Sequence, residues 1–210
     1  MNFPFEDATR RHIAQRCAAF APRAAAATTG ADLKPAAVAI TVIEADTPGV
    51  SAFLLTRRTS GLRAHSGQWA LPGGRCDDGE TAIEAALREL DEELRLRLDA
   101  AAILGQLDDY PTRSGYLITP VVVWAGVRSV LHPNPEEVAS VHRIPLSALV
   151  KEDAVSFTVI PQSERSVIRF CINGDLIHAP TAAILYQFRE VLAGRDTRVA
   201  ELEQPLFAWR

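Results

Sequence analysis

The order of apolar and polar residues along the chain predicts a mixed succession of strands and helices. Runs that are rich in β-branched residues and bounded by turn residues predict strands. These runs cover residues 36–44, 51–56, 101–107, 117–127 and 138–144, and a hairpin is expected from 157–160 and 166–171. Apolar residues at helical spacing predict helices over 6–20, 81–94 and 181–192, with a connector at 24–34 and a helical turn at 145–150.

The predicted helix over residues 81–94 has two different sides. Its alanines are strong helix formers, and its large apolar residues fall in one narrow stripe at roughly 100° per residue. The stripe consists of Ile83, Leu87, Leu90 and Leu94. Glu89, Glu92 and Glu93 gather on another side of the same helix.

This acidic side can be interpreted in two ways. A solvated face is the usual explanation for a group of glutamates on a helix. Here Glu89 and Glu93 are like charges at i,i+4, and neither is expected to have a basic partner, because no basic residue follows one turn further on within the helix. Such a pair costs a few tenths of a kcal/mol. A Mg²⁺ or Mn²⁺ ion, which prefers carboxylate oxygens, would turn that repulsion into coordination.

The residues around the glutamates keep a fixed spacing. They resemble the Nudix box, G-x5-E-x7-R-E-U-x-E-E-x-G-U, in which U is aliphatic. The matching positions are Gly74, Glu80, Arg88, Glu89, Leu90, Glu92, Glu93 and Leu96. The box glycine is replaced by Arg95, which must adopt a left-handed conformation at a cost of about 1 kcal/mol unless the helix ends differently.

The resemblance implies a fold and a metal site. The implied fold is the Nudix α/β/α sandwich, with a mixed β-sheet between helices. We expect a single domain over residues 1–210, with an N-terminal helical extension over 1–34 and a core over about 35–195. The implied ligands of a Mg²⁺ or Mn²⁺ ion are Glu89, Glu92, Glu93 and the Gly74 carbonyl.

The resemblance also implies the roles of the remaining box residues. Arg88 and Glu80 would orient the carboxylates through hydrogen bonds. One of the box glutamates would accept a proton from the attacking water, with Glu89 and Glu92 as the catalytic candidates. Glu137, in an acidic loop before the strand over 138–144, is a further candidate, although an acidic turn in water explains that loop equally well.

A second motif lies upstream of the box. It resembles the signature of the coenzyme A pyrophosphatase branch, L-L-T-x-R-S/A-x3-R-x3-G-x3-F-P-G-G, with Thr59 and Leu71 as replacements. Arginine suits phosphate oxygens because it can donate two parallel hydrogen bonds. The substrate-binding candidates in this basic stretch are Arg57, Arg58, Arg63 and His65. A solvated basic loop is the alternative.

The two motifs together predict a metal-dependent pyrophosphohydrolase. The expected reaction is hydrolysis of coenzyme A or a derivative to 3′,5′-ADP and 4′-phosphopantetheine. One alternative is a Nudix hydrolase of ADP-ribose, a dinucleotide or a nucleoside triphosphate. Another is a non-catalytic Nudix domain that binds a nucleotide or a protein.

Composition limits the partners and the compartment. The 210 residues, 48% of them hydrophobic, are enough for a sizeable core. A net charge of −4 argues against a nucleic-acid partner, and no apolar run approaches the roughly 20 residues of a membrane span. Three widely spaced cysteines favour reduced thiols and a cytoplasmic location. Phe207 and Trp209 need a surface to pack against, which leaves a homodimer open.

Overall fold

The structure, a computed structural model, describes residues 3–24, 33–59, 67–126, 129–172 and 174–209. Three helices of four turns or fewer occur among these residues. They are α1 (Asp7–Ala19), α2 (Ala82–Leu94) and α3 (Thr181–Leu192). Short 3₁₀ turns are η1 (Ala100–Ala102), η2 (Leu146–Ala148), η3 (Glu152–Ala154) and η4 (Leu206–Trp209).

Two β-sheets are present in the described part of the chain. The larger is formed by β1 (Lys34–Glu44), β2 (Ser51–Arg58), β3 (Trp69–Ala70), β4 (Gly73–Arg75), β5 (Ile103–Gln106), β6 (Tyr110–Pro111), β7 (Tyr116–Trp124) and β8 (Val138–Pro145). Strands β1 and β7 pair in parallel, and the other pairs of this sheet are antiparallel. The smaller sheet has the order β11–β10–β9, with β9 (Val155–Ile160), β10 (Ser163–Ile172) and β11 (Asp175–His178).

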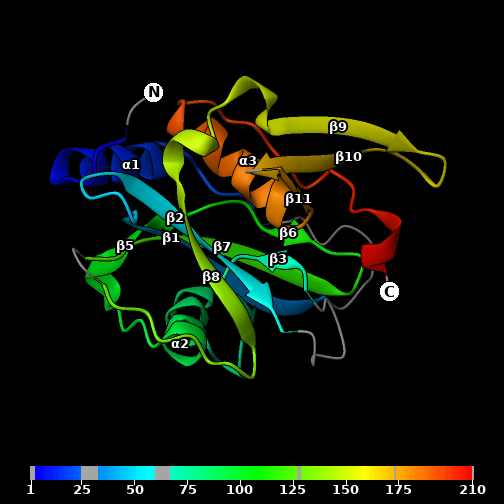
Figure 1. Ribbon diagram of the computed structural model, residues 1–210. Coiled ribbons are helices and arrows are strands. Elements are labelled where there is room, and N and C mark those ends of the chain that lie inside the picture. The colour runs from blue at the N-terminus through cyan, green and yellow to red at the C-terminus, as the bar shows by residue number, and fades with distance from the viewer. Residues whose placement is uncertain (1–2, 25–32, 60–66, 127–128, 173, 210) are drawn as a thin grey trace.

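Helices cover both faces of the larger sheet (Figure 1). On β1, alternate residues enter different cores, because side chains of a strand point alternately to its two faces. Ile40 and Val42 pack in the core that includes α1 and α3, whereas Ala39 and Ile43 pack in the core beneath α2. The structure therefore confirms the expected α/β/α arrangement with a mixed sheet.

The β1 and β2 strands diverge, and this divergence creates the setting of the site. They pair only near their connection, where Val42 lies opposite Phe53. Further along, β8 occupies the other edge of β2, so β3 pairs with β2 and β4 pairs with β1 in the space between them. The Pro72 carbonyl also accepts a hydrogen bond of 2.8 Å from the Ala39 N–H. The glycine-rich segment is therefore wedged into the middle of the sheet.

Several predicted boundaries are confirmed, and others needed correction. The helix over 181–192 has the predicted bounds, and the hairpin is β9–β10. The strand expected from residue 101 starts at Ile103, because Asp99 accepts from the Ala101 N–H and holds a 3₁₀ turn there. The strand expected to reach 127 ends at Trp124, and most of the connector over 24–34 lies outside the described residues. Strands β3, β4, β6 and β11 were not predicted.

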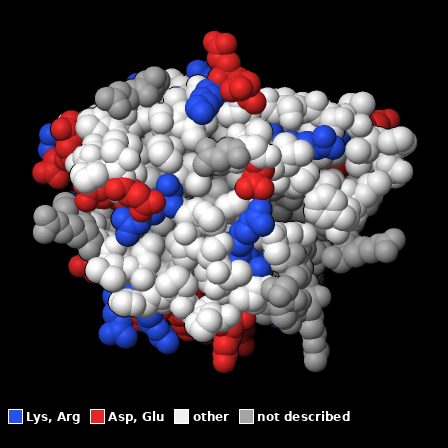
Figure 2. Space-filling view, viewed as in Figure 1, with Lys and Arg blue, Asp and Glu red and all other residues white. Residues whose placement is uncertain are grey.

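Two properties of the whole molecule complete the description. No helix among the described residues is long and apolar enough to cross a membrane. Figure 2 shows acidic and basic side chains in small neighbouring groups, separated by uncharged surface, on the face seen in Figure 1.

Candidate active site

The α2 helix carries the glutamates, and both of its ends are fixed locally. At the start, the Thr81 hydroxyl accepts from the Glu84 N–H at 3.3 Å, while the Glu84 carboxylate accepts from the Thr81 N–H at 2.9 Å. This reciprocal capping box satisfies two backbone donors that the helix leaves unpaired. It sets the register in which Glu89, Glu92 and Glu93 leave the helix.

The other end of α2 adopts the conformation expected of the replaced glycine. Arg95 has φ 54° and ψ 31°, the left-handed region. Its N–H donates to the Asp91 carbonyl, and the Leu96 N–H donates to the Leu90 carbonyl at 3.1 Å. A non-glycine residue pays a steric cost in this conformation, so the helix ends at its family position with some strain.

Arg88 connects the carboxylates of the box. Its guanidinium donates two hydrogen bonds to Glu80, at 2.9 and 3.0 Å, and one of 2.8 Å to the Arg75 carbonyl. Its Nη1 also donates to Glu89 and Glu92, each at 2.9 Å. The hydrogen bond from Arg88 lowers the pKa of Glu80. The expectation that Glu89 lacks a basic partner is therefore wrong, because Arg88 reaches it from the adjacent position.

Glu93 is in a different environment from its two neighbours. Its side chain is 3% exposed, and its Oε2 is buried without a hydrogen-bond partner. Burial raises the pKa of Glu93 to about 8, and the charge of Glu89 adds to this effect. Burial also raises the pKa of Glu89. Both carboxyls thus stand in a place where a negative charge is costly unless a cation accompanies it.

The wedged glycines bring the sheet directly against these carboxyls. A Cβ on Gly74 would overlap the carboxylate of Glu89, and a Cβ on Gly73 would overlap the Ala37 carbonyl of β1. Gly73 also has φ 152°, which side chains rarely allow. Glycine is required here because two elements approach the same point.

The acidic loop before β8 docks on the end of α2. The Asn134 N–H donates to the Glu93 carbonyl and the His132 N–H to the Leu94 carbonyl, each at 2.8 Å. The Asn134 amide donates to Glu137 at 3.2 Å. The charge of Glu137 contributes to the raised pKa of both Glu89 and Glu93. The loop thus brings Glu137 to the same cluster.

The carboxylate oxygens are the type of ligand that a divalent cation prefers, but their arrangement in the described part of the chain is not that of a formed metal site. Among the described residues, no three His, Cys, Asp or Glu side chains converge as a metal-binding group. Arg88 pairs with Glu92, whose side chain is 53% exposed, whereas Glu93 is buried. The unpaired, buried oxygen of Glu93 nevertheless requires a positive partner, and hard cations prefer such oxygen donors. The residues therefore fit a cation that displaces Arg88 from part of the cluster.

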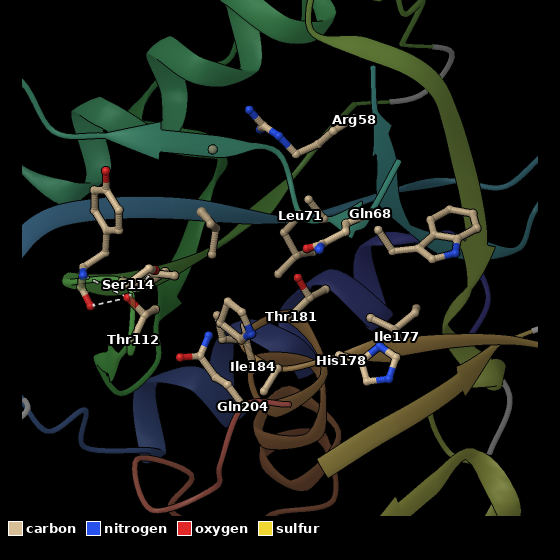
Figure 3. A pocket seen from close by; sticks show the side chains of 18 of the residues that line it. Arg58, Gln68, Leu71, Thr112, Ser114, Ile177, His178, Thr181, Ile184 and Gln204 are labelled. Carbon is tan, nitrogen blue, oxygen red and sulfur yellow. Dashed lines mark hydrogen bonds between the residues drawn. The ribbon is translucent and has the colours of Figure 1, made fainter. Parts of the chain in front are cut away.

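A cavity of about 600 Å³ opens beside the wedge. Gly73, Gly74 and Arg75 form its wall next to the glutamates. Figure 3 shows Arg58 on the side of the cavity nearest α2, opposite Thr181 and Ile184 from α3. Polar groups of Thr112, Ser114 and Gln204 line another side.

The basic residues predicted to bind substrate separate in the structure. Arg57 and Arg58 both line the cavity, but they have different neighbours. The charge of Arg58 lowers the pKa of Glu93, which places Arg58 on the side of the carboxylates. Arg57 pairs with Asp175 of β11 at 3.0 Å. Arg63 and His65 lie outside the described residues.

Tyr116 and Asp175 line the cavity, although nothing in the sequence indicated it. Tyr116 contacts the Arg75 guanidinium through its hydroxyl and its ring, and Asp175 pairs with a residue 118 positions earlier. His178 and Phe207 meet edge to face at 5.0 Å and line the same cavity. The C-terminal aromatic Phe207 therefore packs partly on its own chain, although it remains 56% exposed.

Comparisons with known proteins agree with this geometry. A family model described as the NUDIX domain matches residues 33–162. The uncharacterized Nudix hydrolase NudL of Photorhabdus laumondii is 36% identical over 141 residues, which cover 66% of this chain and 75% of the relative. The NudL of Pectobacterium atrosepticum is 34% identical over 166 residues, covering 77% and 84%. A MutT/nudix family protein from Enterococcus faecalis shares the fold, with a TM-score of 0.52 and 16% identity over 77% of this chain and 62% of that chain.

Proposed function

This chain belongs to the Nudix family of pyrophosphohydrolases, and on that premise we propose that it hydrolyses coenzyme A or a coenzyme A derivative. The proposed products are 3′,5′-ADP and 4′-phosphopantetheine. The proposed cofactor is Mg²⁺ or Mn²⁺, and the substrate is a small nucleotide-containing molecule.

One observation carries the choice of substrate. The signature before the box, from Leu54 to Gly74, contributes Arg58, Leu71 and the two glycines to the wall of the 600 Å³ cavity. The same glycines contact the glutamate cluster, because Gly74 lies against Glu89 and the Gly73 N–H donates to Glu93. A diphosphate lying across Gly73 and Gly74 would have carboxylates on one side, with the Arg58 guanidinium left for a further phosphate of the nucleotide. This cavity is within the ordinary size range of small-molecule sites.

The residues of the cluster have separate proposed tasks. Glu93 and Glu89, with Glu92 after its release from Arg88, hold the cation together with the Gly74 carbonyl. A bound divalent cation supplies positive charge to the phosphate oxygens and lowers the pKa of the attacking water. Glu80 fixes Arg88 through two hydrogen bonds, and Arg88 in turn orients Glu89.

The reaction itself is a substitution at phosphorus. A water oxygen bonds to one phosphorus of the pyrophosphate, and the bond from that phosphorus to the bridging oxygen breaks. A carboxylate accepts the water proton, and we assign this role to Glu89 or Glu137. Both belong to the cluster, and burial raises the pKa of Glu89, which favours its acceptance of a proton.

The test is a panel of diphosphate substrates with identification of the products. Coenzyme A, ADP-ribose, a dinucleotide and a nucleoside triphosphate are compared in Mg²⁺ and in Mn²⁺. We expect the highest kcat/KM for coenzyme A, with release of 3′,5′-ADP. Good turnover of ADP-ribose with none of coenzyme A would replace the proposed substrate by the alternative.

The arginines of the signature provide a second test. Neutralising Arg58 and Arg63 together should raise KM for coenzyme A about tenfold more than KM for the analogue without the 3′-phosphate, because a charge-assisted hydrogen bond is lost. The analogue serves as the internal control. An equal effect on both would assign these residues to the scissile diphosphate instead.

A further inference from the structure

A second cavity, of about 400 Å³, adjoins the one beside the glutamates. The two share four wall residues from different elements: Arg57, Trp69, Asp175 and Ile177. The glutamates adjoin the first cavity at Gly73 and Gly74, which do not line the second. A long substrate anchored at the glycines could therefore extend past Trp69 into a separate compartment.

The walls of the second cavity are suited to an uncharged chain. Four of its nine wall residues are aliphatic and buried: Leu55, Ile144, Ile172 and Ile177. The hydroxyl of Ser140 and the Nε2 of His142 already pair with each other at 2.8 Å. The only basic wall residue of arginine or lysine type among those described is Arg57, which is engaged with Asp175. A second phosphate would find little compensation for its charge here.

One polar atom in the shared wall has no partner. The indole Nε1 of Trp69 is buried without an acceptor, while the ring packs against His142 at 4.6 Å and beneath the Arg57 guanidinium at 4.6 Å. An indole N–H can only donate, so it requires an acceptor such as a carbonyl oxygen. Buried donors of this kind are usually paired, and a ligand can supply the partner.

The boundary between the two cavities is held weakly. The side chains of Arg57 and Asp175 are 40% and 48% exposed, and an ion pair of this exposure contributes little to stability. Arg57 lines both cavities, whereas Arg58 lines only the first. Arg57 and Asp175 thus stand where a chain leaving the diphosphate would pass.

We propose that the second cavity binds the uncharged, amide-bearing arm of the substrate, with the Trp69 N–H donating to an amide carbonyl. This inference rests on the proposed function, because it assigns the pantetheine half of coenzyme A to the compartment beyond Trp69. The nucleotide half remains in the first cavity. The free carbonyl acceptors and aliphatic segments of pantetheine match the unpaired donor and the aliphatic walls.

Two variants test the assignment by different means. Ser140→Phe places a large ring on a side chain that lines only the second cavity. Trp69→Phe keeps an aromatic ring beneath Arg57 and removes the N–H. Ser156→Phe is the matched control, since Ser156 is an exposed strand residue that lines neither cavity. Circular dichroism and thermal unfolding establish that each variant is folded.

The measurement is calorimetric titration with the two product halves separately. Trp69→Phe should weaken the binding of 4′-phosphopantetheine about three- to tenfold, the effect of one hydrogen bond, and Ser140→Phe should weaken it further. Both should bind 3′,5′-ADP as the wild type does, and Ser156→Phe should bind both halves normally.

The outcomes separate this inference from the proposed function. If Trp69→Phe and Ser140→Phe are folded and bind 4′-phosphopantetheine as tightly as the wild type, the second cavity does not bind the pantetheine arm. This holds even if the protein hydrolyses coenzyme A. Equal weakening of both product halves overturns it as well. A wild-type protein that does not hydrolyse coenzyme A overturns the proposed function, whatever the titrations show.

Discussion

At the scale of single residues, Glu93 has the most unfavourable environment in the site. It is 3% exposed, one oxygen is unpaired, and Glu89 and Glu137 add negative charge nearby. Arg58 offsets part of this charge. A residue that lowers stability in this way is typical of sites where function and stability conflict.

The first prediction concerns Glu93 and pH. Its folded-state pKa of about 8 lies above the ordinary 4.5, so between these values the folded protein binds more protons than the unfolded one. Stability without metal should therefore fall as pH rises through this window, by at most about 1.4 kcal/mol per pH unit from this group. Glu93→Gln should remove that contribution, and urea unfolding in a chelator at pH 5–8 measures it.

The same variant also tests the role of the carboxylate. The rate of hydrolysis should be about a hundredfold lower in Glu93→Gln, because a proposed metal ligand is gone while the fold remains. Glu92→Gln is the control for stability, since it removes a charge from an exposed side chain of the same helix. Wild-type turnover in Glu93→Gln would contradict the metal assignment.

The second prediction concerns Arg95. Because its φ is 54°, Arg95→Gly should raise the free energy of unfolding by about 0.5–1 kcal/mol, less the entropy that glycine adds to the unfolded chain. Activity should change little, since the glutamates precede this residue. Chemical denaturation measures the effect, and a clear loss of stability would show that Arg95 has favourable contacts worth more than its strain.

At the scale of elements, the meeting of β4 with α2 determines the site. The chain between β3 and β4 fills the gap where β1 and β2 diverge, and the capping box fixes the register of α2. These two features bring the backbone of Gly74 against Glu89. Neither element alone defines the position of the carboxylate.

The third prediction tests this contact. In Gly74→Ala the new Cβ would overlap the Glu89 carboxylate, which must move away from its hydrogen bond with Arg88. We expect kcat to fall about tenfold or more, because small displacements of catalytic groups are costly. Gly126→Ala is the control, since open space surrounds that position. Equal activity of the two variants would show that Glu89 tolerates the displacement.

At the scale of the whole molecule, cation binding should couple to stability. Only the folded chain brings the glutamates of α2 and the loop before β8 together, so a divalent cation binds the folded state preferentially. At a concentration of about 100 times its Kd, it should add about 2.7 kcal/mol to the free energy of unfolding.

The fourth prediction follows from this coupling. Mg²⁺ or Mn²⁺ should raise the Tm of the wild type, and a chelator should abolish hydrolysis while leaving the circular dichroism spectrum intact. In Glu93→Gln the rise in Tm should be much smaller. NaCl at equal ionic strength separates site binding from general screening. A Tm unaffected by both Mg²⁺ and Mn²⁺ would contradict a cation site in this cluster.

The sequence determined the features that depend on neighbours along the chain. The helical spacing of Ile83, Leu87, Leu90 and Leu94 predicted α2, because this spacing follows from local backbone geometry. The resemblance to the box left two endings of this helix open, and the structure has the left-handed Arg95. Local pattern likewise predicted the central strands and α3. Short strands such as β3 and β11 were not predicted, because two to four residues are too few to show a periodic pattern.

The tertiary structure decided what distant segments do to each other. The sequence grouped Arg57 with Arg58 as phosphate ligands, but Arg57 pairs with Asp175 in the wall shared by the two cavities, whereas Arg58 lies on the side of the carboxylates. It treated Glu89, Glu92 and Glu93 as one acidic face, but Arg88 holds the first two while burial isolates the third. Burial and pairing across the sheet are properties of the packed chain, since they depend on residues that are far apart in sequence and close only after folding.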